Sequence, residues 1–422
     1  MRIVNYENKR EIERVIERSL DLESVFDIVR PILRDVKENG DSALIEYTKR
    51  FDNFDLISEN IKISENEIMD AYSNVSDPFL SAIRHAHKNI EKFHREQFKQ
   101  IKKSWKIETE KGISITEKIA AIESIGAYVP GGIASYPSTV LMTCIPAKIA
   151  NVERIVVVSP PPISPAVLVA CDLCGVNEIY RVGGAQAIAA LAYGTESVRR
   201  VDKIIGPGNR YVMAAKLLVF GIVTIDMPAG PSEVLIIADS EANPRFIAAD
   251  ILAQAEHDPD AQCILVTDSK EIADEVDNEI KNQIEDLKRR EVITQSLENS
   301  YLVLTRDMNE AIEFSNLYAP EHLEIMTKNP EEIAEKIKNA GAIFLGNYSP
   351  VPAGDYASGG NHVLPTGGTA RFSSELGVRD FLRCYSIQKI SKVGLSRLRK
   401  TIETLAEVET LDAHSNAVKK RF

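Results

Sequence analysis

The chain has 422 residues, of which 44% are apolar and 27% are charged, and its formal net charge is -12. This length accommodates two or more domains with separate cores, and the acidic balance argues against a broad nucleic-acid-binding surface. The longest apolar runs, such as 155–158 and 234–238, are strand-sized and too short to span a bilayer. The first residues carry no secretory signal pattern, so we expect a cytoplasmic protein.

Along the chain, residues 7 to about 111 are predicted to be rich in charged helices, because apolar residues recur at helical spacing over 21–39 and 77–103. The second stretch holds His85, His87 and His94 among charged residues, which is typical of a solvated helix face. Residues 104–127 are predicted to form strand hairpins that lead into the following sheet.

Strands that alternate with helices follow in two sets, which indicates parallel βαβ units. The first set has strands at 155–158, 178–182, 203–205 and 223–225, with helices ending at Cys174 and spanning 185–193 and 211–220. The second has strands at 234–238, 263–267, 301–304, 323–326 and 342–345, with helices at 244–256, 270–289 and 330–340.

The five cysteines do not make a disulfide framework in a chain of this length. Cys171 and Cys174 form a C-x-x-C pair, but the apolar sequence around them is typical of a buried helix that ends at Gly175, and the sequence has no second such pair. We expect buried structural thiols rather than a redox or zinc site.

The predicted fold class is α/β, with two Rossmann-like domains built on parallel sheets, one inserted in the other. The predicted boundaries are a helical N-terminal arm over 1–20, a first α/β domain formed by 21–127 and 232–377, an inserted α/β domain over 128–231, and a helical C-terminal arm over 378–422.

Potential metal ligands lie in three segments. Gln254 and His257 are three apart on a predicted helix and share one face of it. Asp355 lies in a Gly-rich loop, and His414 lies in a helical run of the tail. Two imidazoles with oxygen ligands suit zinc, with nickel, cobalt or manganese as replacements. Solvated roles for Gln254 and His414, and a loop-bracing role for Asp355, remain open, as does a tail that reaches the site of a second subunit.

Glu321 and His322 are adjacent, after a Pro and before a predicted strand. We expect them at strand ends, the place where open α/β sheets bind ligands. A carboxylate beside an imidazole can activate water and accept an alcohol proton near neutral pH. A salt-bridged loop is the alternative.

Glycine-rich loops border the first set of strands: Tyr128–Gly132, Gly183–Gln186 and Gly206–Asn209. The last two lie between a strand and a helix, where main-chain amides favour phosphates. None matches G-x-G-x-x-G, so the loops indicate a phosphate or nucleotide site, with tight turns as the alternative.

These motifs together resemble the histidinol dehydrogenase family, over nearly the whole chain from about Ile28 to Ala417. The resemblance rests on the three loops above, on the Glu321 and Asp355 segments, and on Tyr136-Pro-Ser, Ala229–Glu233, Gln254–His257 and Asn361–Pro365. The chain departs from the family at Val351-Pro352, where many relatives have Pro-Glu, and at Thr410, where Gly is common. Neither change removes a proposed ligand.

The resemblance implies oxidation of L-histidinol to L-histidine through L-histidinaldehyde, with two NAD, in the last steps of histidine biosynthesis. It implies His322 as the base for the alcohol and the hydrated aldehyde, and Glu321 as the group that activates water. It implies a homodimer in which the C-terminal arm completes the partner's site. The implied zinc ligands, which also bind substrate with Glu321 and His322, are Gln254, His257, Asp355 and His414; further substrate-binding residues are Ser232, His362 and Glu409; NAD contacts in the 128–231 domain are Tyr128, Gln186 and Asn209.

Three other functions are weighed against this one. A related NAD-dependent dehydrogenase of another small polar alcohol would keep the same metal and NAD residues, but the presence of His362, Glu409 and His414 favours histidinol. A zinc hydrolase would need no NAD loops, and the chain lacks H-E-x-x-H. A non-catalytic nucleotide-binding regulator would leave the acid–base pair and the ligands without a role.

Overall fold

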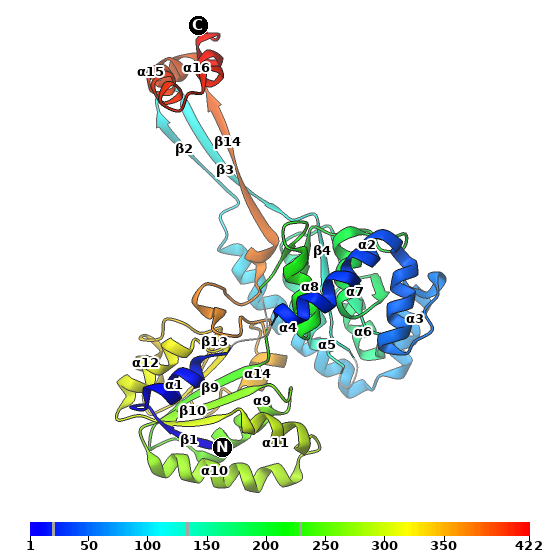
Figure 1. Cartoon of the computed structure of the whole chain (residues 1–422), viewed down its shortest axis with the longest axis vertical. Helices are drawn as coiled ribbons and strands as arrows, with labels where there is room; N and C mark the ends of the chain where they lie inside the picture. The colour runs from blue at the N-terminus through cyan, green and yellow to red at the C-terminus, as the bar shows by residue number, and fades with distance from the viewer. Residues whose placement is uncertain (19–21, 132–134, 228–229) are drawn as a thin grey trace.

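Two parallel sheets organise the computed structural model, which describes residues 1–18, 22–131, 135–227 and 230–422 (Figure 1). The six-stranded sheet consists of β1 (Arg2–Asn5), β9 (Glu233–Ala238), β10 (Gln262–Thr267), β11 (Tyr301–Leu304), β12 (His322–Met326) and β13 (Ala342–Leu345). The five-stranded sheet consists of β4 (Ser124–Tyr128), β5 (Arg154–Ser159), β6 (Glu178–Arg181), β7 (Lys203–Ile205) and β8 (Thr224–Ile225). The predicted α/β class is confirmed.

The two sheets share one topology. Their strand orders are β11-β10-β9-β12-β13, with β1 added at the outer edge, and β6-β5-β4-β7-β8. Apart from β1, the chain enters each sheet at a central strand, β9 or β4, and adds two strands toward one edge. It then returns to the other side of that central strand and adds the last two strands there. This reversal creates a switch point between β9 and β12 in one sheet and between β4 and β7 in the other.

Helices cover both faces of the six-stranded sheet, and β9 shows why. Its alternate residues Val234 and Ile236 pack toward one helical layer, and Leu235 and Ile237 toward the other. The first layer is α9 (Pro244–Ala255), α10 (Lys270–Gln283) and α11 (Arg290–Glu298); the second is α1 (Lys9–Ile16), α12 (Met308–Tyr318) and α13 (Pro330–Ala334). A strand buried on both faces is expected to be apolar throughout, as β9 is after Glu233.

The five-stranded sheet carries an additional helical layer on each side. Its own helices are α5 (Pro137–Ile149), α6 (Pro165–Leu173), α7 (Gly184–Tyr193) and α8 (Arg210–Val219); the outer ones are α2 (Glu23–Asp52), α3 (Glu65–Ala71) and α4 (Asp77–Lys99). The apolar face of α2 packs with α7 and α8, and those of α3 and α4 pack with α5 and α6.

This packing differs from the expected domain boundaries, which grouped 21–127 with 232–377. The helices of 23–99 belong instead with the five-stranded sheet, because α7 is apolar on every side and must be covered by a second layer. The six-stranded domain takes only β1 and α1 from the N-terminal region. One α/β unit still interrupts the other in sequence.

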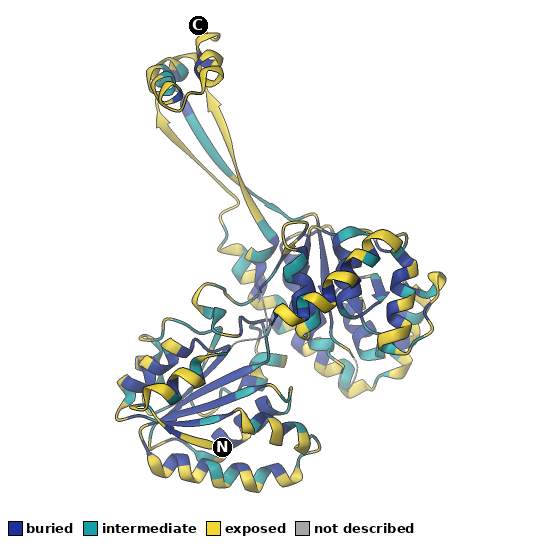
Figure 2. Cartoon of the chain, viewed as in Figure 1, coloured by how far each residue is buried: buried dark blue, intermediate teal, exposed yellow. Residues whose placement is uncertain are grey.

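An arm projects from the two domains (Figure 1). It is an antiparallel sheet of β2 (Ser104–Glu110), β3 (Ile113–Ala121) and β14 (Leu382–Ile390), with α15 (Lys392–Val408) and α16 (Asp412–Lys419) beyond it. The expectation of a helical C-terminal arm over 378–422 was wrong for 382–390, which form a strand. All nine residues of β14 pair with β3, so this largely exposed segment forms a strand, which the sequence analysis did not predict. Figure 2 shows how exposed the arm is.

Several local expectations can be compared with the structure. Cys171 and Cys174 are buried, as predicted. His94 is not on a solvated face: it is fully buried, and its Nδ1 donates to the Ile90 carbonyl oxygen at 2.8 Å. The helix expected over 270–289 ends at Gln283, and that over 330–340 ends at Ala334. Within the described ranges, no helix combines the length and apolarity needed to cross a membrane.

Candidate active site

The acid–base pair lies at the amino edge of the six-stranded sheet. Helix α12 ends at Ala319, which adopts a left-handed conformation (φ 52°), and Pro320 then leads the chain directly to Glu321 and the start of β12. The neighbouring strand β9 begins at Glu233, on the same edge. The pair therefore lies at a switch point, but at the amino ends of the strands and not at the carboxyl ends, where most open α/β sheets bind ligands.

Both residues of the pair are buried, with Glu321 6% and His322 3% exposed. The Oε2 atom of Glu321 accepts a hydrogen bond from the Glu233 main-chain N–H at 2.7 Å and lies 3.4 Å from Nδ1 of His322. The Nδ1 atom lies 2.9 Å from the Glu233 carbonyl oxygen. Because a carbonyl oxygen can only accept, Nδ1 carries a proton. The neutral ring therefore has its lone pair on Nε2.

The Nε2 atom of His322 faces the pocket side of the pair. It lies 3.7 Å from Oδ1 of Asp355 and has no hydrogen-bond partner among the described residues. Burial lowers the pKa of His322, but the carboxylates of Glu321 and Asp355 outweigh burial and hold this pKa well above its ordinary value. Burial raises the pKa of Asp355, and the nearby imidazoles, His322 first, bring it below its usual range.

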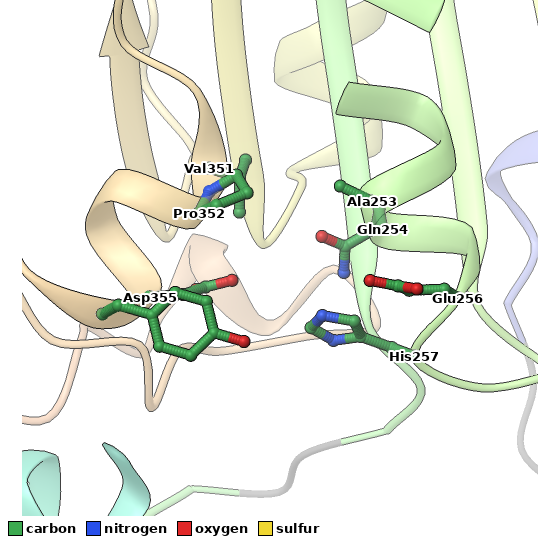
Figure 3. Close-up of a pocket in the computed structure, with 8 residues that line it drawn as sticks. Ala253, Gln254, Glu256, His257, Val351, Pro352 and Asp355 are labelled. Carbon is green, nitrogen blue, oxygen red and sulfur yellow. The ribbon is translucent and has the colours of Figure 1, made fainter. Parts of the chain in front are cut away.

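Three predicted metal ligands line one cavity of about 160 Å³ (Figure 3). Gln254 and His257 lie at the end of α9, which runs back from β9 to the amino edge of the sheet. Asp355 lies on α14 (Val351–Tyr356), and the main-chain N–H of Val351 donates to Glu324 in β12. The remaining lining residues are Ala253, Glu256, Val351, Pro352 and Tyr356.

These three side chains fit a zinc ion by their chemistry. They offer an amide, an imidazole and a carboxylate to one cavity. The fourth predicted ligand, His414, lies on α16 at the far end of the arm and is exposed, as is Glu409 just before it (Figure 1). Within the described part of one chain, no group of three or more His, Cys, Asp or Glu could hold a metal ion.

The predicted substrate-binding residues Ser232 and His362 lie near the pair. Ser232 is half-buried directly before Glu233, and its carbonyl oxygen accepts from Gln262 N–H at 3.1 Å. His362 has Nδ1 2.9 Å from the Asp355 carbonyl oxygen and Nε2 3.4 Å from the Thr139 hydroxyl at the start of α5. His362 therefore connects the pocket to the domain of the five-stranded sheet.

The predicted cofactor contacts gather at the carboxyl edge of the five-stranded sheet. Tyr128 ends β4, and its hydroxyl accepts from Gly184 N–H at 3.1 Å. Asn209 caps α8 by accepting from two main-chain N–H groups. Gln186 is 1% exposed, and its side-chain amide has no partner within the described ranges. Burial raises the pKa of Tyr128 to about 12. Gly132 and Ala229, which belong to two of the motifs, lie outside the described residues.

Gly206 is required by the close approach of the β4 and β7 ends at the second switch point. Gly206 follows β7 with φ +105°, and a Cβ there would lie 2.3 Å from the Tyr128 carbonyl oxygen. Its N–H donates to Asp226 at 2.7 Å, and its carbonyl oxygen accepts from Lys216. Only glycine lets the β4 and β7 ends come this close.

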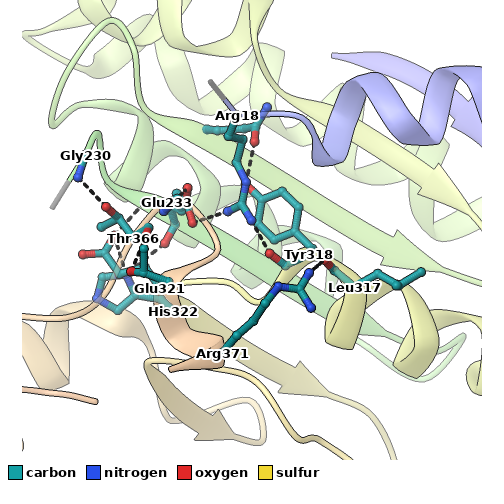
Figure 4. A network of polar contacts seen from close by, with 12 residues as sticks. Arg18, Gly230, Glu233, Leu317, Tyr318, Glu321, His322, Thr366 and Arg371 are labelled. Carbon is teal, nitrogen blue, oxygen red and sulfur yellow. Dashed lines mark hydrogen bonds and ion pairs between the residues drawn. The ribbon is translucent and has the colours of Figure 1, made fainter. Parts of the chain in front are cut away.

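The sequence analysis missed a polar network behind the pair (Figure 4). Glu233 forms a buried ion pair with Arg18, and the Arg18 guanidinium also donates to the Tyr318 carbonyl oxygen. The Thr366 hydroxyl accepts from Gly230 N–H in the same region. One signal was available: Glu233 is the single charged residue of an otherwise apolar strand.

Fold and site define a two-domain α/β enzyme with a buried carboxylate–imidazole pair beside a polar pocket. A family model described as histidinol dehydrogenase matches residues 16–422. The chain is 52% identical over 98% of its length to a histidinol dehydrogenase of Methanocaldococcus jannaschii, covering 96% of that protein. It is 51% identical over its whole length to one of Methanothermobacter thermautotrophicus, covering 99% of that protein.

A solved structure agrees with the sequence comparisons. The crystal structure of histidinol dehydrogenase from Elizabethkingia anophelis superimposes with a TM-score of 0.92 at 43% identity, over 100% of this chain and 98% of that one. The chain belongs to the histidinol dehydrogenase family and is thus an oxidoreductase.

Proposed function

We propose that this protein oxidises L-histidinol to L-histidine through L-histidinaldehyde, with two NAD and a zinc ion, as the final steps of histidine biosynthesis in the cytoplasm. Family membership supports the substrate. The observation that carries the chemistry is the unpartnered Nε2 of His322, which lies 3.7 Å from the pocket residue Asp355.

The residues of this chain supply the proton transfers. Removal of a hydride from an alcohol carbon requires loss of the hydroxyl proton. Despite burial, the carboxylates of Glu321 and Asp355 raise the pKa of His322, so Nε2 would be free to accept this proton when Asp355 binds zinc and no longer stabilises the imidazolium. The aldehyde gives up no second hydride until water adds, and the Glu321 carboxylate accepts the proton of that water. After His322 has released its first proton to solvent, it takes a proton from the hydrate as the second hydride leaves, which yields the carboxylate. NAD, when bound, would accept each hydride, which is a proton together with two electrons, and become NADH.

Gln254, His257 and Asp355 would hold the zinc ion together with His414 of a second copy, and the ion would anchor the imidazole and amino nitrogens of the substrate. Such an anchor suits a reaction in which the aldehyde must remain bound while the NAD is exchanged. Ser232, His362 and Glu409 would contact the substrate. The exposed His414, remote from its own pocket, supports a homodimer whose arms complete each other's sites.

Tyr128, Gln186 and Asn209 would bind NAD. They lie at the carboxyl ends of parallel strands on both sides of a switch point, the usual position of a nucleotide in this kind of sheet. His362 and Thr139 connect this edge to the pocket, which would bring the nicotinamide toward the substrate carbon.

The test is a count of NADH per L-histidinol consumed, with and without a chelator. Two NADH, lost on chelation and restored by zinc, are expected. Metal-loaded dimeric protein that leaves L-histidinol unchanged would contradict the substrate, and a panel of other small amino alcohols and sulfonated alcohols would then identify the one that it oxidises.

A further inference from the structure

Glu233 contacts both members of the acid–base pair through its main chain. Its N–H donates to Glu321 at 2.7 Å, and its carbonyl oxygen accepts from His322 Nδ1 at 2.9 Å. A single peptide segment therefore sets the orientation of the carboxylate and of the imidazole. Any displacement of that segment moves both groups at once.

The side chain of Glu233 holds this segment in place. One carboxylate oxygen pairs with Arg18 at 2.5 Å, and the other accepts from Gly367 N–H at 2.9 Å. The Glu233 side chain is only 5% exposed. Burial raises the pKa of Glu233 to about 7, although Arg18 and the Gly367 N–H lower it. The charged form of this carboxylate therefore depends on these two partners.

Arg18 connects Glu233 to the segment that carries Glu321. Its guanidinium lies 3.6 Å above the Tyr318 ring and donates to the Tyr318 carbonyl oxygen, three residues before Glu321. The Tyr318 hydroxyl in turn donates to Gln262 at 2.5 Å. Arg18 thus joins the start of β9 to the end of α12, the two segments between which the pair is held (Figure 4).

We propose that Glu233 is a positioning residue for Glu321 and His322, and that Arg18 positions Glu233. This proposal rests on the proposed function, because it assigns a role in the same reaction. Neither residue lines the pocket that holds Gln254, His257 and Asp355. Their loss is therefore expected to change the rate of the chemical steps and not the binding of substrate or metal. A misplacement of about 1 Å can reduce a rate by about 10²-fold.

The experiment compares Glu233→Ala and Arg18→Met with a matched control in the full-length enzyme. The control is Arg154→Met, which breaks the Arg154–Glu178 ion pair at the start of β5 and β6, away from the site. We expect kcat per folded subunit to fall about 10- to 100-fold in the first two variants. The KM for L-histidinol and the zinc content should stay at the wild-type values. Arg154→Met should lower the stability of the protein and leave kcat and KM unchanged.

A double variant covers the case in which a lone buried charge prevents folding. Arg18→Met/Glu233→Gln leaves no unpaired charge, and Gln keeps an acceptor for Gly367 N–H. Its kcat should fall no further than that of the worse single variant, because the two side chains act on one segment. Wild-type kcat in the folded variants, or a raised KM at unchanged kcat, would overturn the positioning role.

A measurement independent of turnover separates this proposal from the proposed function. The Nδ1 proton of His322, identified by its absence in His322→Gln, should exchange slowly with water in wild type and Arg154→Met and quickly in Glu233→Ala. If wild type fails to oxidise L-histidinol, the proposed function falls and this proton still decides the positioning role. Equal exchange in all three proteins would overturn it.

Discussion

Oδ1 of Asp355 lies 3.7 Å from Nε2 of His322, so the pocket and the acid–base pair share one boundary. The two residues come from α14 and β12, which the Glu324–Val351 hydrogen bond holds together at 2.9 Å. A group bound in the pocket is thereby placed beside the base. The predictions below test the separate parts of this arrangement.

Replacing His322 by Ala removes Nε2, the ring nitrogen that has no hydrogen-bond partner among the described residues. We expect kcat to fall about 10²- to 10⁴-fold, the usual contribution of a general base. Zinc content, measured by elemental analysis, should not change, because His322 does not line the pocket. His85→Ala, on an exposed face of α4, is the control. Unchanged turnover in His322→Ala would disprove its role as the base.

Glu321→Gln tests the second half of the reaction. An amide cannot accept the proton of water, so hydration of the aldehyde should slow while the first hydride transfer continues. We expect the yield in a single turnover to fall from two NADH toward one, with L-histidinaldehyde trapped by a carbonyl reagent. A variant that still delivers two NADH at the wild-type rate would show that another group activates the water.

Mixing two inactive variants tests the shared site. His257→Ala removes a pocket ligand and His414→Ala removes an arm residue, so each homodimer should be inactive. A mixed dimer contains one site with neither change. Random subunit exchange makes about half of the dimers mixed, so about a quarter of the wild-type activity should return. Failure to recover activity in a verified mixed dimer would place His414 in the site of its own chain, whereas an active His414→Ala homodimer would place it outside the site.

Gly206→Ala and Gly221→Ala differ in surroundings but share backbone strain. Gly206 and Gly221 have φ values of +105° and +100°. A Cβ at 206 would meet the Tyr128 carbonyl oxygen, whereas a Cβ at 221 would meet none of the described residues within 4 Å. Each change should cost about 1–3 kcal/mol of stability through strain. Only Gly206→Ala should also weaken NAD binding, by tenfold or more in a fluorescence titration. Equal NAD affinities in the two variants would show that NAD does not bind at this edge of the five-stranded sheet.

Glu324→Gln tests a buried carboxyl behind the pocket. Burial raises the pKa of Glu324 well above 4.5, and the nearby Asp250 raises it further. The folded protein therefore binds this proton more tightly than the unfolded chain does, so stability falls as pH rises from about 4.5 toward the folded-state pKa. Glutamine removes this loss and still accepts from Val351 N–H.

The variant should be more stable than wild type at neutral and alkaline pH, by roughly 1–2 kcal/mol. Urea unfolding at several pH values measures this, with the exposed Glu332→Gln as control. Parallel stability curves for Glu324→Gln and wild type would contradict the assignment.

The sequence by itself determined the α/β class, because alternating apolar strands and amphipathic helices are local patterns that need no knowledge of contacts. The strands predicted at 234–238 and 263–267 lie within β9 and β10. It also indicated Gln254, His257 and Asp355 as potential metal ligands, and the structure places all three at one pocket. Helical spacing placed the first two on one face, and a Gly-rich segment marked the third.

Only the tertiary structure decided that residues 23–99 belong to the domain of the five-stranded sheet. The sequence of an amphipathic helix indicates that one face is buried, but not which element covers it. The same holds for β14, whose largely exposed residues form a strand by pairing with β3. It also holds for Glu233 and Arg18, which are 215 residues apart in the chain and form an ion pair only when the sheet is assembled. The local sequence pattern indicates which residues of a segment must be buried, whereas tertiary packing determines which elements cover them.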